Sequence, residues 1–347
     1  MLNNKIKAIL ALVMISLFVV GCSSNDDSGS EGEEVDKIKV AYHPHLVGLG
    51  ALIAAEENDY FSDENLEVEL IEFTSGSTEL QAMASGDIDL GYLGVGAHVF
   101  APQGEAEIIS IDSTDISSEI MVRADSGIET IDDLKDKTVA ISSGTTSDLA
   151  LSLAIENSDL TEDDIEKVDM DASAKVTSFM TDKVDAVAME SPYTDQIRKD
   201  LGEDEVVTIQ SSEDFLPEAV FTNSWAATPK YLEDNEDVTV RFLKALVKGI
   251  DYRYNNMEES IELTADYLNE EPEVIGQLED KTNWLSASDI EELYEDGTVN
   301  EWYDKMIDMF TEADLLDEEY AVSSDEYVIE EYLMQAIEEL KDEGALD

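Results

Sequence analysis

Cysteine and histidine are scarce in this chain of 347 residues, which contains one Cys and three His. A single Cys forms no disulfide within the chain, and so few Cys and His residues build no cysteine-rich zinc site. Basic residues are also few, since 20 Lys and Arg stand against 83 Asp and Glu and give a net charge of −63. A charge of this sign repels phosphate backbones, so the sequence excludes a nucleic-acid-binding protein.

Motifs of common enzyme classes are missing as well. The chain has no GxSxG elbow, no Walker A loop, no HExxH and no GxGxxG that opens a helix. We therefore expect a protein that is not an enzyme and that needs no cofactor. Hydrophobic residues make up 43% of the chain, which is enough to bury two cores in a chain of this length.

One apolar run lies near the start of the chain, from Ile9 to Val20, and follows two lysines. It is shorter than the roughly 20 residues that a membrane-spanning helix needs. It ends in VVGC, which resembles the lipobox of bacterial lipoproteins. The resemblance implies that residues 1–21 are a signal peptide and that lipidated Cys22 holds the protein on the outer face of the cytoplasmic membrane. The polar, acidic residues 22–36 predict a flexible tether.

Strand and helix patterns alternate from residue 37, and the chain is almost wholly helical after residue 227. Short apolar strands separated by helical stretches indicate βαβ units and a mainly parallel sheet. The rhythm restarts after residues 118–123 and predicts a second α/β unit. We expect strands at 37–42, 66–73, 88–93, 107–112, 118–123, 138–141, 165–170, 185–189, 206–209 and 219–227, with helices at 49–58, 78–85, after 96, at 146–157 and at 172–180.

Small and hydroxyl-bearing residues follow several of the predicted strands. Ligands of open α/β sheets bind beyond the carboxyl ends of the strands, and such residues at a helix start leave backbone N–H groups free to face a ligand oxygen. Neutral donors are expected to hold the ligand, because these loops contain no Lys or Arg. The four loops are Tyr42–His45, Thr74–Thr78, Gly94–His98 and Ser142–Ser147.

All three histidines, His43, His45 and His98, lie at predicted strand ends or at the helix starts just after them. Three histidines without metal-ligand spacing are weak support for a metal site, so we expect ligand hydrogen bonding or cleft lining and no metal. Asp112 and Glu190 also lie at predicted strand ends. They would suit a ligand with a cationic or hydrogen-bond-donating end and would oppose a purely anionic one unless they point away.

Three stretches of the sequence carry a family resemblance. They run from YHPHLVGLG to SGDIDLGYLG, over VRADSGIETIDDLKDKTVAISSGTT, and over DKVDAVAMESPYT. They resemble the extracytoplasmic solute-binding proteins of bacterial ABC importers for nitrate, aliphatic sulfonates and taurine, a group whose relatives bind thiamine-pyrimidine precursors. The resemblance covers Ile38 to Leu268. One departure is Met189 before Glu190, where many sulfonate-type members carry a Trp.

The family implies an α/β fold of the periplasmic-binding-protein type, with two α/β lobes, an interlobe ligand cleft and a helical C-terminal part. Residues 37–122 and 222–347 would form lobe I, residues 123–221 would form lobe II, and hinges would lie near 121–124 and 221–225. The expected ligand-binding residues are His43, His45, Ser75, Gly76, Ser77, Gly94, Val95, Gly96, His98, Ser143, Gly144, Thr145, Thr146, Glu190 and Tyr193.

The resemblance also implies a function. A monomer would capture a small sulfonate-, taurine- or nitrate-like ligand outside the membrane and deliver it to ABC permease subunits by lobe closure. One alternative is a binding protein for a thiamine-pyrimidine precursor, and another is a receptor that presents its ligand to a membrane sensor. A less favoured one is a pyrimidine-synthase-like enzyme of the same fold, whose Cys-rich motif is absent here.

The acidity predicts a halophilic or alkaliphilic source, and it can be tested with salt. Removal of the signal peptide with its two lysines would change the net charge from −63 to −65. Because the Debye length falls to about 3 Å in about 1 M salt, repulsion among the carboxylates is screened there. The unfolding temperature should therefore rise between low salt and molar KCl or NaCl. A thermal melt that does not move with salt would contradict the halophilic interpretation.

Overall fold

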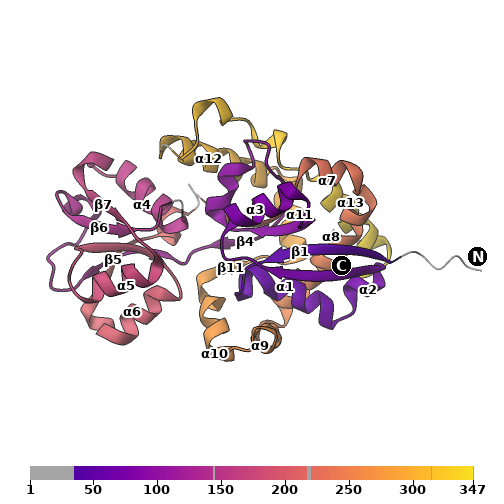
Figure 1. Ribbon diagram of the computed structural model, residues 1–347, viewed down its shortest axis with the longest axis horizontal. Helices are drawn as coiled ribbons and strands as arrows, with labels where there is room; N and C mark the ends of the chain where they lie inside the picture. Colours follow the sequence, from indigo (N-terminus) through magenta and orange to yellow (C-terminus); the bar gives the residue numbers. More distant parts are fainter. Residues whose placement is uncertain (1–34, 144, 217–219, 314, 347) are drawn as a thin grey trace, which may run out of the picture. The chain divides into compact units, whose positions relative to one another are not determined.

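The computed structural model describes residues 35–143, 145–216, 220–313 and 315–346, which form two α/β lobes (Figure 1). The predicted signal peptide, Cys22 and most of the predicted tether lie outside the described residues, as does Gly144. Within the described part of the chain, no helix has the length and apolar character needed to cross a membrane.

Lobe I is the lobe built on a six-stranded sheet with the strand order β11-β4-β10-β3-β1-β2. β1 runs parallel to β2 and β3, whereas β10 is antiparallel to β3 and β4, and β11 is antiparallel to β4. The strands are β1 (Asp36–Tyr42), β2 (Leu66–Glu72), β3 (Leu90–Leu93), β4 (Glu107–Asp115), β10 (Thr222–Ala227) and β11 (Thr282–Trp284).

Lobe II is the lobe built on a five-stranded sheet with the order β7-β6-β8-β5-β9. β6 runs parallel to β7 and β8, and β5 is antiparallel to β8 and β9. The strands are β5 (Ser118–Arg123), β6 (Thr138–Ile141), β7 (Glu166–Asp169), β8 (Ala186–Glu190) and β9 (Val206–Ser211).

Both sheets are mixed: four of the six strands of lobe I and four of the five strands of lobe II run in one direction, and β10, β11 and β5 run against them. The reason lies in how the chain passes between the lobes. Parallel neighbours need a crossover of a dozen or more residues. β5 instead follows β4 after two residues, Ile116 and Ser117, and begins beside the carboxyl end of β8, where Ser118 pairs with Glu190. β10 enters the first sheet in the same way, with Ser224 opposite Leu93 at the end of β3.

Helices cover the sheets of both lobes, and most of the predicted ones are present. The exception is the helix expected after Gly96, which is the 3₁₀ helix η1 (Val95–Phe100). The α-helices of the two α/β units are α1 (Leu46–Glu57), α2 (Tyr60–Asp63), α3 (Gly76–Ser85), α4 (Thr146–Glu156), α5 (Ala172–Met180) and α6 (Tyr193–Leu201).

The C-terminal part adds seven α-helices among the described residues and only the short strand β11, which agrees with the helical prediction. α8 packs closely on α1, and a Cβ added at Gly249 would lie 2.2 Å from the carbonyl oxygen of Ala51, so only glycine fits there. The helices are α7 (Pro229–Asp234), α8 (Glu236–Asn255), α9 (Met257–Leu268), α10 (Pro272–Ile275), α11 (Ala287–Glu295), α12 (Thr298–Glu312) and α13 (Glu331–Asp342).

Seven further 3₁₀ helices connect these elements in the described residues. Two of them begin with capping boxes formed by Thr130 with Asp133 and by Thr161 with Asp164. The 3₁₀ helices are η2 (Ile131–Leu134), η3 (Glu162–Asp164), η4 (Glu203–Glu205), η5 (Ser212–Phe215), η6 (Gly276–Lys281), η7 (Glu318–Tyr320) and η8 (Ser324–Glu326).

The chain passes from one sheet to the other at residues 116–117 and returns across 216–221, of which 217–219 are outside the described residues. The first hinge expected from the sequence, near 121–124, falls at the end of β5, in which Met121 is fully buried, and it stays a prediction. The expected lobe boundaries stay a prediction, since strand pairing defines sheets and not the bodies that move.

A buried ion pair joins the C-terminal helices to the sheet of lobe I. The Arg253 and Asp112 side chains are both fully buried, and Arg253 Nη2 lies 3.0 Å from Asp112 Oδ2. Trp225 Nε1 donates to Asp112 Oδ1 at 3.1 Å, and Arg253 Nη1 donates to the carbonyl of Val47 at 3.3 Å. The guanidinium also stacks 4.6 Å from the Trp284 ring centre. Asp112 thus lies inside β4 and not at its end, because β4 runs on to Asp115.

Arg253→Met should destabilise the protein strongly, because it leaves the Asp112 carboxylate buried without its cation. Loss of one partner of a buried pair costs about 3–5 kcal/mol in the free energy of unfolding. Urea denaturation followed by circular dichroism would measure the loss. Adding Asp112→Asn should recover part of it, and Lys230→Met, which removes an exposed partner of Asp234, should change little. A stability loss of Arg253→Met no larger than that of Lys230→Met would contradict this account.

Candidate functional site

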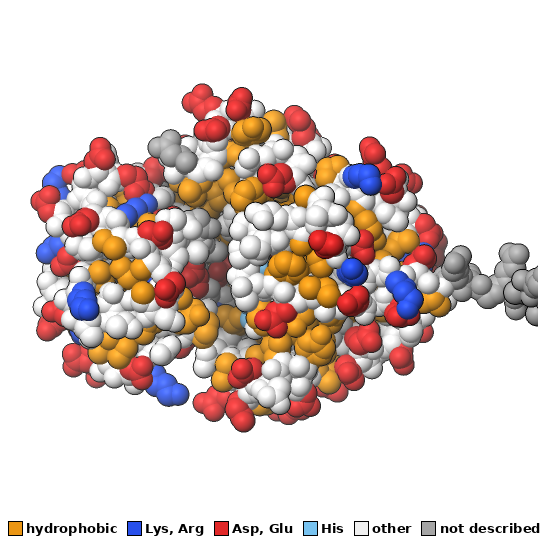
Figure 2. Space-filling view, viewed as in Figure 1, with side chains coloured by type: hydrophobic (Ala, Val, Ile, Leu, Met, Phe, Trp, Pro, Cys, Tyr) orange, Lys and Arg blue, Asp and Glu red, His pale blue; other side chains and the backbone are white. Residues whose placement is uncertain are grey.

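Two adjoining cavities lie between the lobes, at the carboxyl ends of the parallel strands. The larger has a volume of about 700 Å³ and the smaller about 220 Å³, and they share several lining residues, among them His43, Gly94 and Glu190. Figure 2 shows the hollow between the lobes, with acidic side chains inside it. We call the two cavities together the cleft.

Most of the predicted site residues line the larger cavity. From lobe I these are His43, His45, Ser75, Gly76, Ser77, Gly94, Val95 and Gly96, and from lobe II Ser143, Thr145, Thr146, Glu190 and Tyr193. Gly144 lies outside the described residues, and His98 lines neither cavity. The structure thus brings loops from both lobes to one cleft, as the strand-end rule predicts. Ligand contact by these residues stays a prediction.

The loop after β1 contributes two histidines to the lining of the cleft. His43 Nε2 lies 3.0 Å from Oε2 of Glu79, a side chain without solvent exposure. His45 is the N-cap of α1, and its Nδ1 accepts the N–H of Gly48 at 3.1 Å. Burial, followed by the neighbouring His43, lowers the pKa of His45 to about 3. His45 is therefore a neutral ring near pH 7.

The loop after β2 leads into α3. Ser75 is the N-cap residue of α3, but its hydroxyl does not cap the helix and lies 2.9 Å from the Ser77 hydroxyl. Gly76 packs on η1, and a Cβ added there would come within 2.4 Å of Ala97 Cβ. The first N–H groups of α3 therefore start at the cleft without a cap from Ser75, which suits them to an oxygen acceptor.

The loop after β6 leads into α4 in the same manner, from lobe II. Thr145 is the N-cap residue of α4 without a side-chain cap, and its Oγ1 donates to the carbonyl of Ser142 at 2.9 Å. The N–H of Ser147 instead donates to Glu190 Oε1 at 2.9 Å. The side chain of Glu190 is 25% exposed, and its Oε2 lies 4.0 Å from Nζ of Lys175. One glutamate at the end of β8 thus caps a helix and borders the cleft.

Asp115 at the end of β4 was missed by the sequence analysis. Its Oδ1 accepts the N–H of Ser117 at 2.6 Å, and its Oδ2 accepts the Ser117 hydroxyl at 3.0 Å. Burial raises the pKa of Asp115 to about 6, and Glu190 contributes to the rise. The smaller cavity contains Asp115, Ser117 and Asn223, together with Leu278 and Thr282 from the C-terminal part.

His98 points into the core of lobe I. Its Nδ1 lies 3.1 Å from the carbonyl oxygen of Val95, so Nδ1 carries the proton, and Nε2 accepts from the Ser224 hydroxyl at 3.0 Å. Burial lowers the pKa of His98 to about 4. The structure therefore separates His98 from His43 and His45. Among the described residues, no three His, Cys, Asp or Glu side chains are grouped so as to hold a metal ion.

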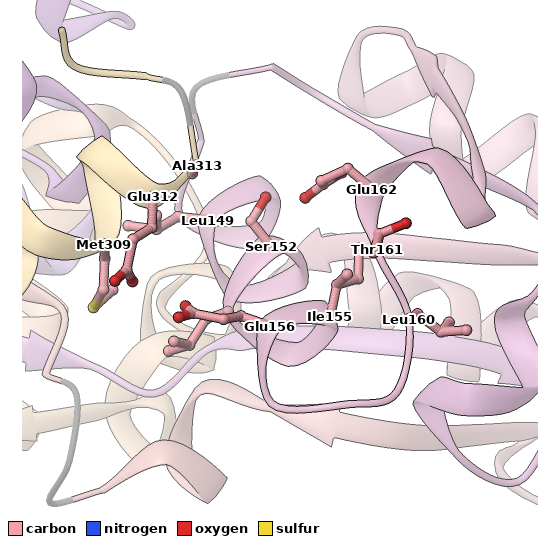
Figure 3. Close-up of a pocket in the computed structure, with 11 residues that line it drawn as sticks. Leu149, Ser152, Ile155, Glu156, Leu160, Thr161, Glu162, Met309, Glu312 and Ala313 are labelled. Carbon is pink, nitrogen blue, oxygen red and sulfur yellow. The ribbon is translucent and has the colours of Figure 1, made fainter. Parts of the chain in front are cut away.

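A third pocket, of about 300 Å³, lies between α4 and α12 (Figure 3). Glu156 of α4 and Glu312 of α12 border it, and burial together with the Glu312 carboxylate raises the pKa of Glu156. None of the loops that follow the parallel strands reaches it. We therefore place the candidate site in the cleft.

Comparison with curated proteins gives relatives that are named as binding proteins. A putative binding protein of Brucella abortus is 27% identical over 273 residues, which is 79% of this chain and 84% of the relative. A putative aliphatic sulfonates-binding protein of Bacillus subtilis is 24% identical over 81% of this chain and 84% of its own length. A formylaminopyrimidine-binding protein of Halalkalibacterium halodurans is 24% identical over 73% of this chain and 76% of its own length.

Solved structures show the same fold. The periplasmic aliphatic sulphonate binding protein of Escherichia coli matches with a TM-score of 0.68 and 21% identity, over 84% of this chain and 97% of that one. The desulfurization enzyme DSZB matches with a TM-score of 0.62 and 14% identity, over 88% of this chain and 99% of that one. The expected periplasmic-binding-protein fold is thereby confirmed. The sequence model described as "NMT1/THI5 like" matches residues 48–260, and because this is more than half of the chain, the protein belongs to the NMT1/THI5-like family.

Proposed function

We propose that this protein is the extracytoplasmic solute-binding component of an ABC importer and captures a small sulfonate-, taurine- or nitrate-like ligand in the cleft. The observation that carries the proposal is a cavity lined from both lobes by hydroxyl and glycine loops at helix starts. The relatives named as sulfonate-binding proteins support the same class of ligand.

Lobe closure supplies the mechanism. A ligand that contacts loops of both lobes binds the closed arrangement more tightly than the open one and shifts the population toward it. The closed form would then dock on the permease subunits and release its ligand there. No covalent step is needed for this cycle.

Neutral groups would hold the ligand oxygens. Among the described residues that line the two cavities there is no Lys and no Arg. The donors that remain are hydroxyls and the N–H groups at the starts of α3 and α4, where the helix dipole adds a favourable partial charge. The cleft therefore suits a weakly hydrated oxyanion or a polar heterocycle better than a phosphate that needs a cationic clamp.

The first alternative is a binding protein for a thiamine-pyrimidine precursor, which the formylaminopyrimidine-binding relative favours. An enzyme of this fold is less favoured, although DSZB shows that the fold supports catalysis. A thermal-shift screen of sulfonates, taurine, nitrate and pyrimidines would separate the first two classes. An aldimine absorption band after incubation with pyridoxal phosphate would instead support the pyrimidine-synthase class.

The lipid anchor and the monomeric state belong to the same proposal. The VVGC sequence supports lipid attachment at Cys22 on the outer face of the cytoplasmic membrane. Cys22→Ala should release the protein from the membrane fraction if this is correct, and light scattering of the released protein would give its oligomeric state.

Ser77→Ala and Thr145→Ala should each weaken binding of the best ligand from the screen by about tenfold to a hundredfold. A hydrogen bond to a charged ligand contributes roughly 1.5–3 kcal/mol, and each variant removes one hydroxyl from a different lobe. The Thr145 hydroxyl would exchange its bond to the Ser142 carbonyl for one to the ligand. Isothermal titration calorimetry would give the dissociation constants, and circular dichroism would verify the fold. Ser173→Ala, on the exposed start of α5, serves as the matched control. If both cleft variants kept full affinity, the two hydroxyls would not contact the ligand, and these loops would serve only as the starts of α3 and α4.

A further inference from the structure

Two carboxylates from different lobes border the smaller cavity, which we call the inner end of the cleft. Asp115 ends β4 of lobe I and Glu190 ends β8 of lobe II, and both line the smaller cavity. They are close enough for the charge of Glu190 to contribute to the raised pKa of Asp115. The two groups therefore face the same space from opposite sides of the interlobe boundary.

The nearby cations are held elsewhere. Lys281 Nζ donates to Glu119 Oε1 at 3.2 Å. Lys175 Nζ donates to the carbonyl of Ala188 at 2.9 Å and lies 4.0 Å from Glu190 Oε2. Neither lysine lines a cavity of the cleft. The inner end of the cleft is therefore an acceptor surface, and a bare anion placed there would be repelled.

The larger cavity, which we call the outer end of the cleft, offers hydrogen-bond donors. The larger cavity contains the Ser75 and Ser77 hydroxyls and the starts of α3 and α4. Because the two serine hydroxyls share one hydrogen bond, one O–H of the pair is left to donate, whereas Thr145 Oγ1 donates to the Ser142 carbonyl. Asp115 and Glu190 already accept hydrogen bonds from Ser117 and Ser147. A carboxylate has about four lone-pair sites, so each retains capacity for a further donor.

We propose that the cleft selects a ligand with two unlike ends: an oxygen-rich end held by the hydroxyl loops and a nitrogen end held between Asp115 and Glu190. The nitrogen end is an ammonium or an amino group on a heterocycle, which donates N–H bonds to both carboxylates. This inference rests on the proposed function and names the chemical class of its ligand. It assigns Asp115 and Glu190 the role of specificity-determining residues.

The test compares matched ligands on the full-length mature protein at about pH 8, where a free Asp carboxyl is ionised. Taurine and ethanesulfonate differ only in the amino group, and so do 4-amino-5-hydroxymethyl-2-methylpyrimidine and 5-hydroxymethyl-2-methylpyrimidine, whose hydroxymethyl oxygen supplies the other end. In one of the two pairs, the ligand with the amino group should bind at least about tenfold more tightly. The pair that shows the preference tells whether the nitrogen is aliphatic or heterocyclic. This comparison requires no variant.

Two isosteric variants then test whether Asp115 and Glu190 cause the preference for the ligand with the amino group. Asp115→Asn and Glu190→Gln keep an oxygen that can accept from Ser117 and Ser147, respectively, and remove the charge. Each should reduce the preference to within about threefold, and the ligand without the amino group should bind at least as well as before. Glu213→Gln on the exposed start of η5 is the matched control and should keep the preference.

The pH dependence gives an independent readout. The preference should shrink as the pH falls below about 6, because burial raises the pKa of Asp115 to about 6 and the protonated carboxyl loses its attraction for a cation. The other titratable groups that face Asp115 are Glu190, Lys281 and Tyr92, and His43 and His45 line the same cavity. Asp115→Asn should make the preference nearly independent of pH in this range.

Two results would count against the inference in different ways. Equal affinities of the wild-type protein within both ligand pairs, or an unchanged preference in both cleft variants, would overturn the nitrogen-binding role and leave the proposed function in place. Failure of every sulfonate, nitrate and pyrimidine to bind would overturn the proposed function, and the inference with it.

Discussion

The pair of Arg253 and Asp112 is the contact on which much of lobe I depends. It places a charged α8 side chain beneath the sheet, and the same carboxylate holds the indole of Trp225 in β10. Asp112 lies three residues before the end of β4, so this anchor also fixes the point at which the chain leaves the lobe. Asp115 lies on the strand that this buried pair anchors, three residues further along.

The arginines of the chain form ion pairs and do not line the two cavities of the cleft, as the structure describes them. All four arginines form ion pairs within the described part of the chain: Arg123 with Asp182, Arg198 with Glu119, Arg241 with Asp36 and Asp237, and Arg253 with Asp112. In a chain with so many carboxylates, each guanidinium offsets local repulsion where strands and helices meet. The described residues that line the cleft therefore offer N–H groups at helix starts, hydroxyls and carboxylates. These groups decide which ligands the cleft can accept.

The sequence was sufficient to predict most strands, the C-terminal helices and the loops of the cleft, because strand periodicity and the strand-end rule are local signals. It did not predict Asp115 or Ser117, since β4 continues through the polar stretch 112–115, which has no apolar alternation. Leu278 and Thr282 reach the cleft only through the packing of the C-terminal part. His98 was predicted at the cleft but turns into the core, because hydrogen bonds to Val95 and Ser224 satisfy both of its nitrogens.

The connection between β4 and β5 consists of Ile116 and Ser117 alone, and this limits how the lobes can part. Two extended residues reach only about 7 Å, so the lobes cannot separate by translation at this point. Under the proposed closure, the lobes would rotate about this connection. Because Asp115 and Ser117 lie at that connection, the inner end of the cleft would change least during opening, and the hydroxyl loops at the outer end would move furthest. A ligand would then enter and leave past the loops and keep its inner end near the connection until the last step of release.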